Sequence, residues 1–253
     1  MIQEPPTPAP GLSMIVLITT DRRLGVGHHD SPRVRPRRDE SFVNEAYVNA
    51  VRAAGGVPLL VAPGEADLDA LFSVADAVVI TGGNLDIHPH HYGALVSARL
   101  DTPDERRTES ELAIARRCIQ DGVPVLGVCG GMQALAVAAG GTLLQDIHTL
   151  VPDALEHEQP TDPAEGWHSL RVESSALRLV LGRAPVVNST HHQAVDDPGP
   201  FRPVAWAPDG VIEAIELPGH PFCTGVQWHP ELLGVQPYTL MVDVARALGR
   251  GGR

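Results

Sequence analysis

The sequence predicts an α/β fold built around a mostly parallel sheet. Short apolar runs bounded by turn residues alternate with amphipathic stretches up to Gly141, and this alternation is typical of such sheets. The chain has 253 residues, of which 43% are hydrophobic, so it is long enough to bury one substantial core. We therefore expect a single domain over residues 13–253, preceded by a flexible proline-rich tail over residues 1–12.

The part of the chain before Gly141 predicts four strands and four helices. Each strand is a short apolar run, and most of the helices carry apolar side chains at helical spacing. The third helix is the longest. The segment Thr102-Pro103-Asp104-Glu105 resembles its capping box, with proline at the first helical position, and Gly122 ends it. The expected strands cover residues 14–19, 57–62, 75–81 and 123–128, and the other helices cover residues 41–54, 66–73 and 131–139.

After Gly141 the pattern becomes more irregular. Short strand-like pieces predict an added antiparallel region, and a closing helix is expected over residues 237–248. We find no internal repeat or low-complexity linker, which supports one domain. The strand-like pieces cover residues 142–145, 169–173, 186–188, 204–207, 212–216 and 224–227.

Composition and charge argue against several classes of function. The formal net charge of −12 would repel a nucleic acid backbone. No apolar run approaches the ~20 residues that a membrane span requires, and the first residues do not resemble a secretory signal. The chain contains no lysine, which excludes a Schiff-base lysine and a phosphate-binding Walker lysine. We expect neither a nucleic acid nor a membrane as a partner.

The cysteines and one arginine cluster add two further expectations. Cys118, Cys129 and Cys223 are odd in number and far apart, so they favour a reducing, cytoplasmic compartment over a disulfide framework or a zinc finger. Cys118 and Cys223 are expected to pack in the core. The arginine cluster over residues 33–38 has two interpretations: a solvated loop, which is favoured, or a group that steers carboxylates to the mouth of a site.

The segment around Cys129 predicts a nucleophile elbow. An apolar strand runs into Gly127-x-Cys129-x-Gly131 and then into a helix, which is the pattern that exposes a nucleophile on a tight turn. The helix N-terminus would stabilise a thiolate, and the backbone N–H of Gly130 would point at a developing oxyanion. For this motif alone, a buried cysteine beside a glycine turn is an equally good interpretation.

A second segment, Gly225-Val226-Gln227-Trp228-His229-Pro230-Glu231, supplies the groups that such a nucleophile needs. A strand would deliver His229 to its end, and Glu231 could turn back to bind the second imidazole nitrogen. The histidine would accept the thiol proton, and the carboxylate would fix its tautomer. Together with the elbow, these residues predict a catalytic triad of Cys129, His229 and Glu231.

These two segments resemble the two signatures of class I glutamine amidotransferases. Further segments are similar to one branch, the peptidase C26-like γ-glutamyl-γ-aminobutyrate hydrolases of putrescine degradation, and the resemblance runs from about residue 14 to residue 248. It implies a flavodoxin-like, doubly wound sheet with helices on both faces, and hydrolysis of a γ-glutamyl amide. The further segments are residues 47 and 53–59, residues 81–84, 89 and 92–93, and residues 188–194.

The resemblance also implies roles for several residues. The N–H of Gly83 would be the second oxyanion donor, although Gly82-Gly83 could also be a simple tight turn. Gln133 lies one helical turn beyond Cys129 and would contact the glutamyl group. The far side of the substrate would meet the segment that contains His191, His192 and Gln193.

The chain departs from this branch in two places, and both concern the substrate or a metal. Gly130 follows the nucleophile where these hydrolases often carry arginine, and residues 88–91 are unusually rich in histidine. Histidine is a common metal ligand, but no glutamate or cysteine accompanies His88, His90 and His91 at zinc-site spacing. We expect no metal and no cofactor.

The predicted function is hydrolysis of a small γ-glutamyl amine through a γ-glutamyl thioester. Three alternatives remain open at this stage: a glutaminase subunit that supplies ammonia to a partner synthase, a non-catalytic protein on the same fold, and a cysteine peptidase acting on γ-linked peptides. The presence of all three triad residues disfavours the non-catalytic alternative. A homodimer is compatible with the sequence.

Overall fold

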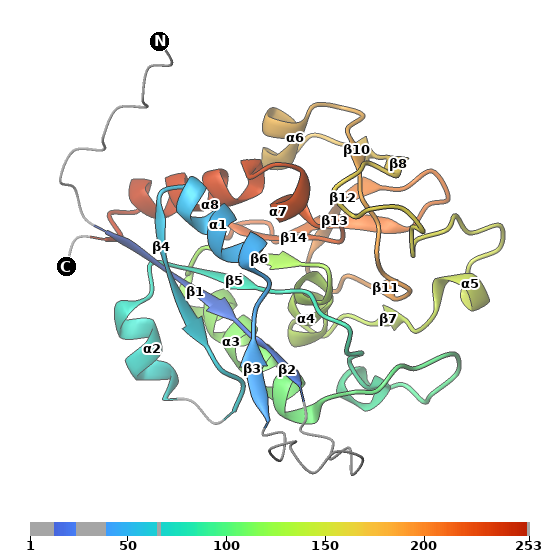
Figure 1. The fold of residues 1–253 in the computed structure, drawn as a ribbon, viewed down its shortest axis with the longest axis horizontal. Coiled ribbons are helices and arrows are strands. Elements are labelled where there is room, and N and C mark those ends of the chain that lie inside the picture. The colour runs from blue at the N-terminus through green and yellow to red at the C-terminus, as the bar shows by residue number, and fades with distance from the viewer. Residues whose placement is uncertain (1–12, 24–38, 65–66, 252–253) are drawn as a thin grey trace, which may run out of the picture.

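The computed structural model describes residues 13–23, 39–64 and 67–251. The predicted tail over residues 1–12 and the arginine cluster over residues 33–38 lie outside the described residues. A ten-stranded sheet runs through the middle of the molecule (Figure 1). Its first five strands are parallel, in the order β4 (Gly56–Val61), β1 (Met14–Thr19), β5 (Ala77–Ile80), β6 (Val125–Val128) and β14 (Cys223–Val226).

The strand order confirms the doubly wound, flavodoxin-like sheet. The chain leaves β1 toward β4 on one side, and then returns to add β5, β6 and β14 on the other. This reversal is the topological switch point, where ligand sites of such folds form at the carboxyl ends of the strands. The antiparallel part continues the sheet through β13 (Ile212–Glu216), β11 (Ala194–Val195) and β7 (Leu143–Leu144), with β12 (Arg202–Trp206) and β9 (Arg171–Val172) paired alongside.

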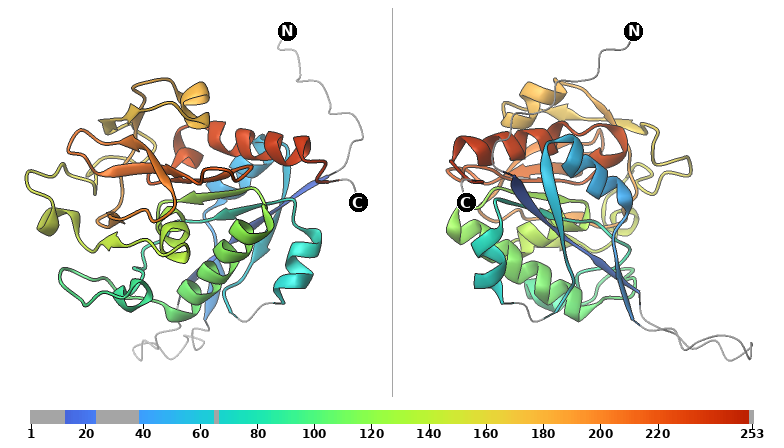
Figure 2. Two further views of the ribbon diagram at one scale, coloured as in Figure 1. Left: turned by 180° about the vertical axis from the view of Figure 1, so that it is seen from behind. Right: turned by 60° about the vertical axis from the view of Figure 1, so that its left-hand side comes forward.

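Helices cover both faces of the parallel sheet (Figures 1 and 2). On one face, α1 (Glu45–Ala53) and α8 (Gln236–Ala247) pack against the sheet in one hydrophobic cluster. On the other face, α2 (Leu68–Val74), α3 (Glu105–Asp121) and α4 (Gly130–Ala138) pack in a second cluster. Successive side chains of β1 alternate between the two, because neighbouring residues of a strand point to opposite faces: Val16 and Ile18 join the first cluster and Leu17 the second.

Shorter elements complete the chain. Strands β8 (His168–Ser169) and β10 (Val186–Val187) form a two-stranded pair, as do β2 (Asp21–Arg23) and β3 (Glu40–Phe42). The short helices are η1 (Pro89–Tyr92), α5 (Ile147–Leu150), α6 (Ala176–Leu181) and α7 (Pro230–Leu233).

Three predicted helix starts are wrong, and each has a local cause. Helix α2 begins at Leu68 rather than at residue 66, because Asp67 caps it and accepts a hydrogen bond from the N–H of Ala70. The first helix begins at Glu45 rather than at residue 41, because residues 40–42 pair with β2 and the side chain of Asn44 accepts a hydrogen bond from the N–H of Ala46 at 2.9 Å. The long helix is capped by Asp104, whose carboxylate accepts from the N–H of Arg107 at 2.9 Å. Residues 102 and 103 therefore precede the helix, and the predicted capping box does not form.

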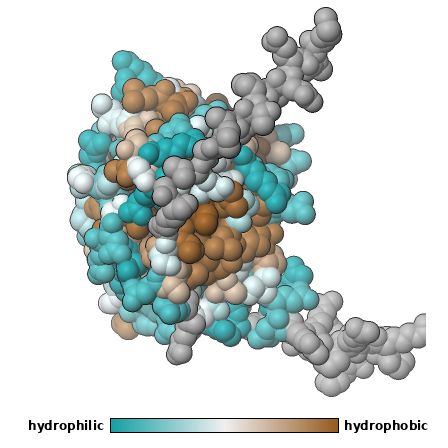
Figure 3. All heavy atoms as spheres, turned by 90° about the vertical axis from the view of Figure 1, so that its left-hand side faces the viewer, coloured by the Kyte–Doolittle hydropathy of each residue, from teal (hydrophilic) through white to brown (hydrophobic). Residues whose placement is uncertain are grey.

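The outer edge of the sheet carries exposed apolar side chains. Strand β4 is an edge strand, and its Val57, Leu59 and Leu60 are 47%, 41% and 50% exposed. Figure 3 shows an apolar area on the side of the molecule to which this strand belongs. Such areas are common at contacts between proteins, and the predicted homodimer stays a prediction.

None of the helices within the described residues has the length and apolar character needed to cross a membrane.

Candidate active site

Cys129 lies on a strained turn between β6 and α4. Its φ is +52° and its ψ is −110°, a conformation that costs a non-glycine residue about 1–3 kcal/mol. Two hydrogen bonds hold the backbone there: the N–H of Cys129 donates to the carbonyl of Val226 at 2.8 Å, and the N–H of Met132 donates to the carbonyl of Cys129 at 3.0 Å. The sequence prediction of an elbow at Cys129 agrees with this local geometry.

The two glycines that flank the elbow are required by close packing. A Cβ atom on Gly127 would lie 2.5 Å from the carbonyl oxygen of Gly131. A Cβ atom on Gly131 would lie 2.0 Å from the carbonyl oxygen of Ile80, which belongs to β5. Because these neighbours are backbone atoms, they cannot move aside. Glycine at both positions lets α4 begin directly against the sheet.

His229 follows β14 and is held from both sides. Its Nδ1 lies 2.7 Å from Oε1 of Glu231, whose side chain is only 2% exposed. The side chain of Asn188 brackets the backbone of His229: Oδ1 accepts from the N–H at 2.8 Å, and Nδ2 donates to the carbonyl at 3.1 Å. Tyr238 donates its hydroxyl proton to the other oxygen of Glu231 at 3.4 Å. The imidazole therefore has a fixed position and a fixed carboxylate partner.

Cys129 and His229 meet beside Gly82. A Cβ atom on Gly82 would lie 2.9 Å from Cβ of Cys129 and 3.0 Å from Cε1 of His229. Burial lowers the pKa of His229, but hydrogen bonds and charge interactions with Cys129 and Glu231 outweigh burial and raise this pKa to about 10. A cysteine beside an imidazole that a carboxylate holds is the arrangement of a nucleophile with its general base.

Tyr47 is a site residue that the sequence reasoning did not assign. Its hydroxyl accepts a hydrogen bond from the N–H of Gly82 at 2.9 Å and lies 3.4 Å from Nδ1 of His229. Burial, followed by the charge of Glu231, raises the pKa of Tyr47 well above its usual value, so the phenol stays neutral. In the sequence Tyr47 continues the apolar spacing of a helix and belongs to the segments that carry the family resemblance, and neither signal separates it from a core residue.

Arg107 orients the peptide bond that carries the predicted donor Gly83. Its Nη2 donates to the carbonyl of Gly82 at 3.0 Å and to that of Thr81 at 3.2 Å. In a trans peptide the N–H points opposite to the carbonyl, so the N–H of Gly83 points away from Arg107. The nitrogen of Gly83 lies 4.0 Å from the place of a Cβ atom on Gly130. The two predicted oxyanion donors are therefore neighbours.

Arg107 is itself fixed in a buried ion network. It is 4% exposed, its Nε donates to Glu111 at 3.0 Å, and its Nη1 donates to Asp21 at 2.9 Å. A Cβ atom on Gly83 would lie 2.0 Å from Nη1 of Arg107. Glycine at residue 83 therefore leaves the space that the guanidinium occupies.

Two cavities meet at Cys129. One, of about 380 Å³, contains the predicted substrate residues together with Gly83 and Gly130. The other, of about 360 Å³, contains His229 and Glu231, and it also includes Tyr47 and Gly82. The substrate residues in the first cavity, which we call the Gln133 cavity, are Gln133, His191, His192 and Gln193. The structure thus brings all nine predicted site residues to the two cavities.

The predicted substrate residues differ in what they can offer a ligand. Gln133 donates to the carbonyl of Gln193 at 3.1 Å, which fixes its amide. His192 lies 3.0 Å from Asp86, and this hydrogen bond raises the pKa of His192 above its usual value. Burial lowers the pKa of His191 to about 4, which keeps its ring neutral. The amide oxygen of Gln193 has no hydrogen-bond partner among the described residues.

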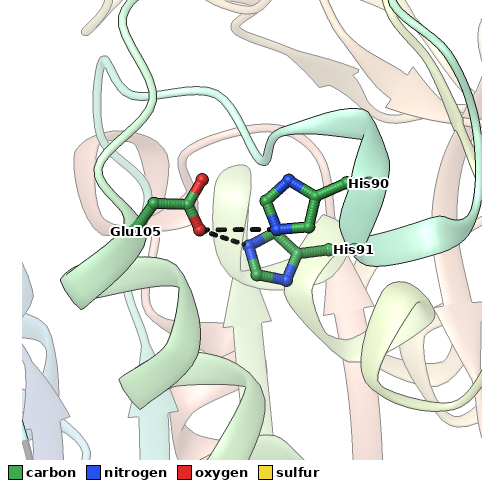
Figure 4. Close-up of side chains that lie close together, drawn as sticks. All are labelled: His90, His91 and Glu105. Carbon is green, nitrogen blue, oxygen red and sulfur yellow. Dashed lines mark hydrogen bonds and ion pairs between the residues drawn. The ribbon is translucent and has the colours of Figure 1, made fainter.

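The histidine-rich segment acquires an acidic neighbour that its sequence spacing did not indicate. Oε2 of Glu105, at the start of α3, lies 2.8 Å from Nε2 of His91 and 3.6 Å from Nε2 of His90 (Figure 4). The three side chains could hold a metal ion. None of them contacts the two cavities at Cys129, and two of the three are exposed.

The other two cysteines are core residues. Cys118 and Cys223 are 0% and 2% exposed, and burial raises the pKa of both thiols. Neither lines the cavities at Cys129.

Comparisons with known proteins agree with this geometry. The sequence profile of the peptidase C26 family matches residues 20–231. The chain belongs to this family. It is 34% identical to the gamma-glutamyl-gamma-aminobutyrate hydrolase of Escherichia coli over 75% of this chain and 78% of that protein. It is 38% identical, over 82% of this chain and 68% of the relative, to a protein of Mycobacterium tuberculosis that is provisionally named a glutamine amidotransferase.

Solved structures support the same fold. A protein of Thermoplasma acidophilum, provisionally named as a component of GMP synthase, aligns with a TM-score of 0.60 and 16% identity, over 93% of this chain and 96% of the other. A glutamine amidotransferase of Methylobacillus flagellatus aligns with a TM-score of 0.53 over 87% and 71% of the two chains. The findings together identify a class I glutamine amidotransferase-like fold and support a hydrolase.

Proposed function

We propose that this protein is a cysteine hydrolase that cleaves the γ-glutamyl amide bond of a small γ-glutamyl amine. The products are glutamate and the free amine. One observation carries the proposal: Cys129 sits on a strained elbow beside His229, whose outer nitrogen is held by Glu231. This is the geometry of a nucleophile, a general acid–base and an orienting carboxylate.

The chemistry follows from the positions of these groups. The thiolate of Cys129 attacks the γ-carbonyl carbon, and the N–H groups of Gly83 and Gly130 stabilise the oxyanion. Protonated His229 gives its proton to the leaving amine, and a γ-glutamyl thioester remains on Cys129. Neutral His229 then removes a proton from water, which hydrolyses the thioester. Glu231 orients the imidazole in both steps.

The two cavities divide the substrate at the scissile bond. The leaving amine must lie on the side of His229, because this imidazole protonates it. The glutamyl group then occupies the Gln133 cavity, where amide groups and the imidazole of His192 can bind its polar atoms. Arg107 acts as a positioning residue, since it holds the Gly82 carbonyl and thereby aims the N–H of Gly83.

The name of the Escherichia coli relative supports a γ-glutamyl-γ-aminobutyrate-like substrate, and a role in putrescine degradation stays a prediction. Other relatives carry names of the amidotransferase type. A glutaminase that feeds ammonia to a synthase would use the same chemistry with glutamine as substrate. The hydrolase and the glutaminase therefore differ in the leaving group of the substrate and in the need for a partner protein.

A substrate panel tests this proposal. The purified chain is incubated with γ-glutamyl-γ-aminobutyrate, γ-glutamyl derivatives of neutral and cationic amines, and glutamine, and the released glutamate is measured. We expect turnover of at least one γ-glutamyl amine without any partner protein, and no turnover by the Cys129→Ala variant. Hydrolysis of glutamine alone, and only after a synthase is added, would reject the stand-alone hydrolase.

A further inference from the structure

A second group of chemically active side chains lies buried behind the Gln133 cavity. His157, His168, His191 and Glu213 are 2%, 7%, 5% and 0% exposed. His168 belongs to β8 and Glu213 to β13, whereas the other two come from connecting segments. We call these four residues the His157 cluster. The hydrolytic mechanism uses none of the ring nitrogens and carboxylate oxygens that face one another inside it.

The His157 cluster converges on one carboxylate oxygen. Oε1 of Glu213 lies 3.5 Å from Nδ1 of His157, 3.5 Å from Nε2 of His168 and 3.6 Å from Nε2 of His191. These distances are longer than good hydrogen bonds. In a tetrahedral zinc site with metal–ligand bonds of about 2.0–2.1 Å, two ligand atoms lie about 3.3 Å apart. The three distances to Oε1 of Glu213 are close to this separation.

The outer nitrogen of each histidine faces an oxygen that can only accept a hydrogen bond. Metal-binding histidines are usually held in this way, because the outer partner fixes the tautomer and leaves the inner nitrogen as a lone pair. The three contacts are His157 Nε2 to the carboxylate of Asp209 at 2.9 Å, His191 Nδ1 to the carbonyl of Gln193 at 3.0 Å, and His168 Nδ1 to the carbonyl of Ser169 at 3.3 Å.

Polar atoms on the inner side of the cluster lack hydrogen-bond partners within the part of the chain that the structure describes. Both oxygens of Glu213 and Nε2 of His168 are buried without a hydrogen-bond partner among the described residues. Polar atoms in this state are costly unless a cation or proton joins them.

Ser189 is the remaining polar neighbour, and it does not fill this need. Its Oγ lies 3.1 Å from Nδ1 of His157 and 3.2 Å from Nε2 of His191. However, it donates its hydroxyl proton to the carbonyl of His157 at 2.9 Å. The same proton cannot also reach either ring nitrogen, so both inner nitrogens remain available as ligands.

We propose that the His157 cluster is a structural metal site that binds Zn²⁺ through His157, His168 and Glu213, whose ligand atoms all lie within 4.8 Å of one another, and that Nε2 of His191, 3.6 Å from Oε1 of Glu213, moves in as the fourth ligand when the ion binds. Three imidazoles and one carboxylate form a ligand set that suits zinc. Since all four positions of a tetrahedral ion are then filled by protein atoms, the site has no open position for a substrate and is structural rather than catalytic.

The site has a consequence for the neighbouring cavity. His191 lines the Gln133 cavity, and Asn188, which brackets the backbone of His229, is the residue before Ser189. A metal ion would join this segment to β8 and β13 and hold it against the sheet. Loss of the metal should therefore loosen the support of His229 as well as lower stability.

Metal content tests the proposal directly. Tag-free protein is stripped with a chelator, equilibrated with Zn²⁺ and desalted, and bound zinc is measured by mass spectrometry. We expect about one zinc ion per chain in the wild type and a loss of at least tenfold in Glu213→Gln and in His168→Asn. The double variant His90→Asn/His91→Asn, which removes the exposed histidines near Glu105, should bind as the wild type does.

Two further readouts on the wild type keep the test decisive if a variant fails to fold. Zinc should raise Tm by about 5 °C or more, and X-ray absorption should show imidazole ligands at about 2.0 Å. The proposal is overturned if the stripped and reloaded wild type retains no zinc. It is also overturned if zinc is lost from the His90/His91 variant and kept by Glu213→Gln, since the ion then occupies the exposed site.

Discussion

The Cys129→Ser variant is expected to lose at least about 10⁴-fold in kcat for its best γ-glutamyl substrate. A thiol loses its proton far more readily than a hydroxyl, and the imidazolium of His229 stabilises the resulting thiolate. Serine differs by one atom and can keep the same backbone conformation, so Tm should stay close to that of the wild type. Steady-state kinetics and thermal melting measure the two quantities.

A second cysteine provides the matched control. Cys118 is fully buried in α3, away from both cavities. The Cys118→Ala variant should lower stability by about 1 kcal/mol, because it leaves a small cavity, and should keep its kcat. A Cys129→Ser variant with activity within tenfold of the wild type would show that another group attacks the substrate.

The Glu231→Gln variant is expected to lower kcat by about 10²–10⁴-fold and to change the pH profile. Hydrogen bonding and charge from Glu231 help to raise the pKa of His229 to about 10. The wild type should therefore keep its kcat/KM through the neutral range and lose it only as the pH rises toward about 10, where the imidazolium loses its proton. Glutamine removes the charge, so the pKa of His229 falls and the alkaline limb moves to lower pH.

The pH profile separates this role from a structural one. Glu109→Gln removes a carboxylate from an exposed position of α3 and controls for the change in net charge. Its kcat/KM profile should overlay that of the wild type. If Glu231→Gln lowers kcat but leaves the alkaline limb where it was, then Glu231 does not act through the protonation of His229.

The parallel part of the fold could be predicted because each strand is a separate apolar run. The central strands β5 and β6 are buried along their whole length, and a completely apolar run predicts a strand of this kind. In the antiparallel part, β11 and β7 have two residues each. Such short strands are determined by pairing with distant segments, and the sequence alone gives no local signal for them.

The site residues also divide into those that a local motif predicts and those that only the folded chain brings together. Cys129 and His229 could be predicted because each lies in a local sequence motif. The glycines around Cys129 permit the tight turn, and the proline after His229 ends the strand. Arg107 stands in a charged stretch of α3 and resembles a solvent-exposed arginine in the sequence. Its burial depends on Asp21 and Glu111, and only the folded chain brings Asp21 to it. The His157 cluster was missed for a related reason, because its ligands are far apart along the chain.

A covalent intermediate on Cys129 is the central claim, and acid quenching during turnover tests it. The wild type is mixed with a γ-glutamyl substrate, denatured in acid within the first turnovers and digested for mass spectrometry. The account predicts a γ-glutamyl group on the peptide that contains Cys129, which disappears when the thioester is treated with hydroxylamine. Rapid release of glutamate with no acyl group on this peptide at any quench time would contradict it.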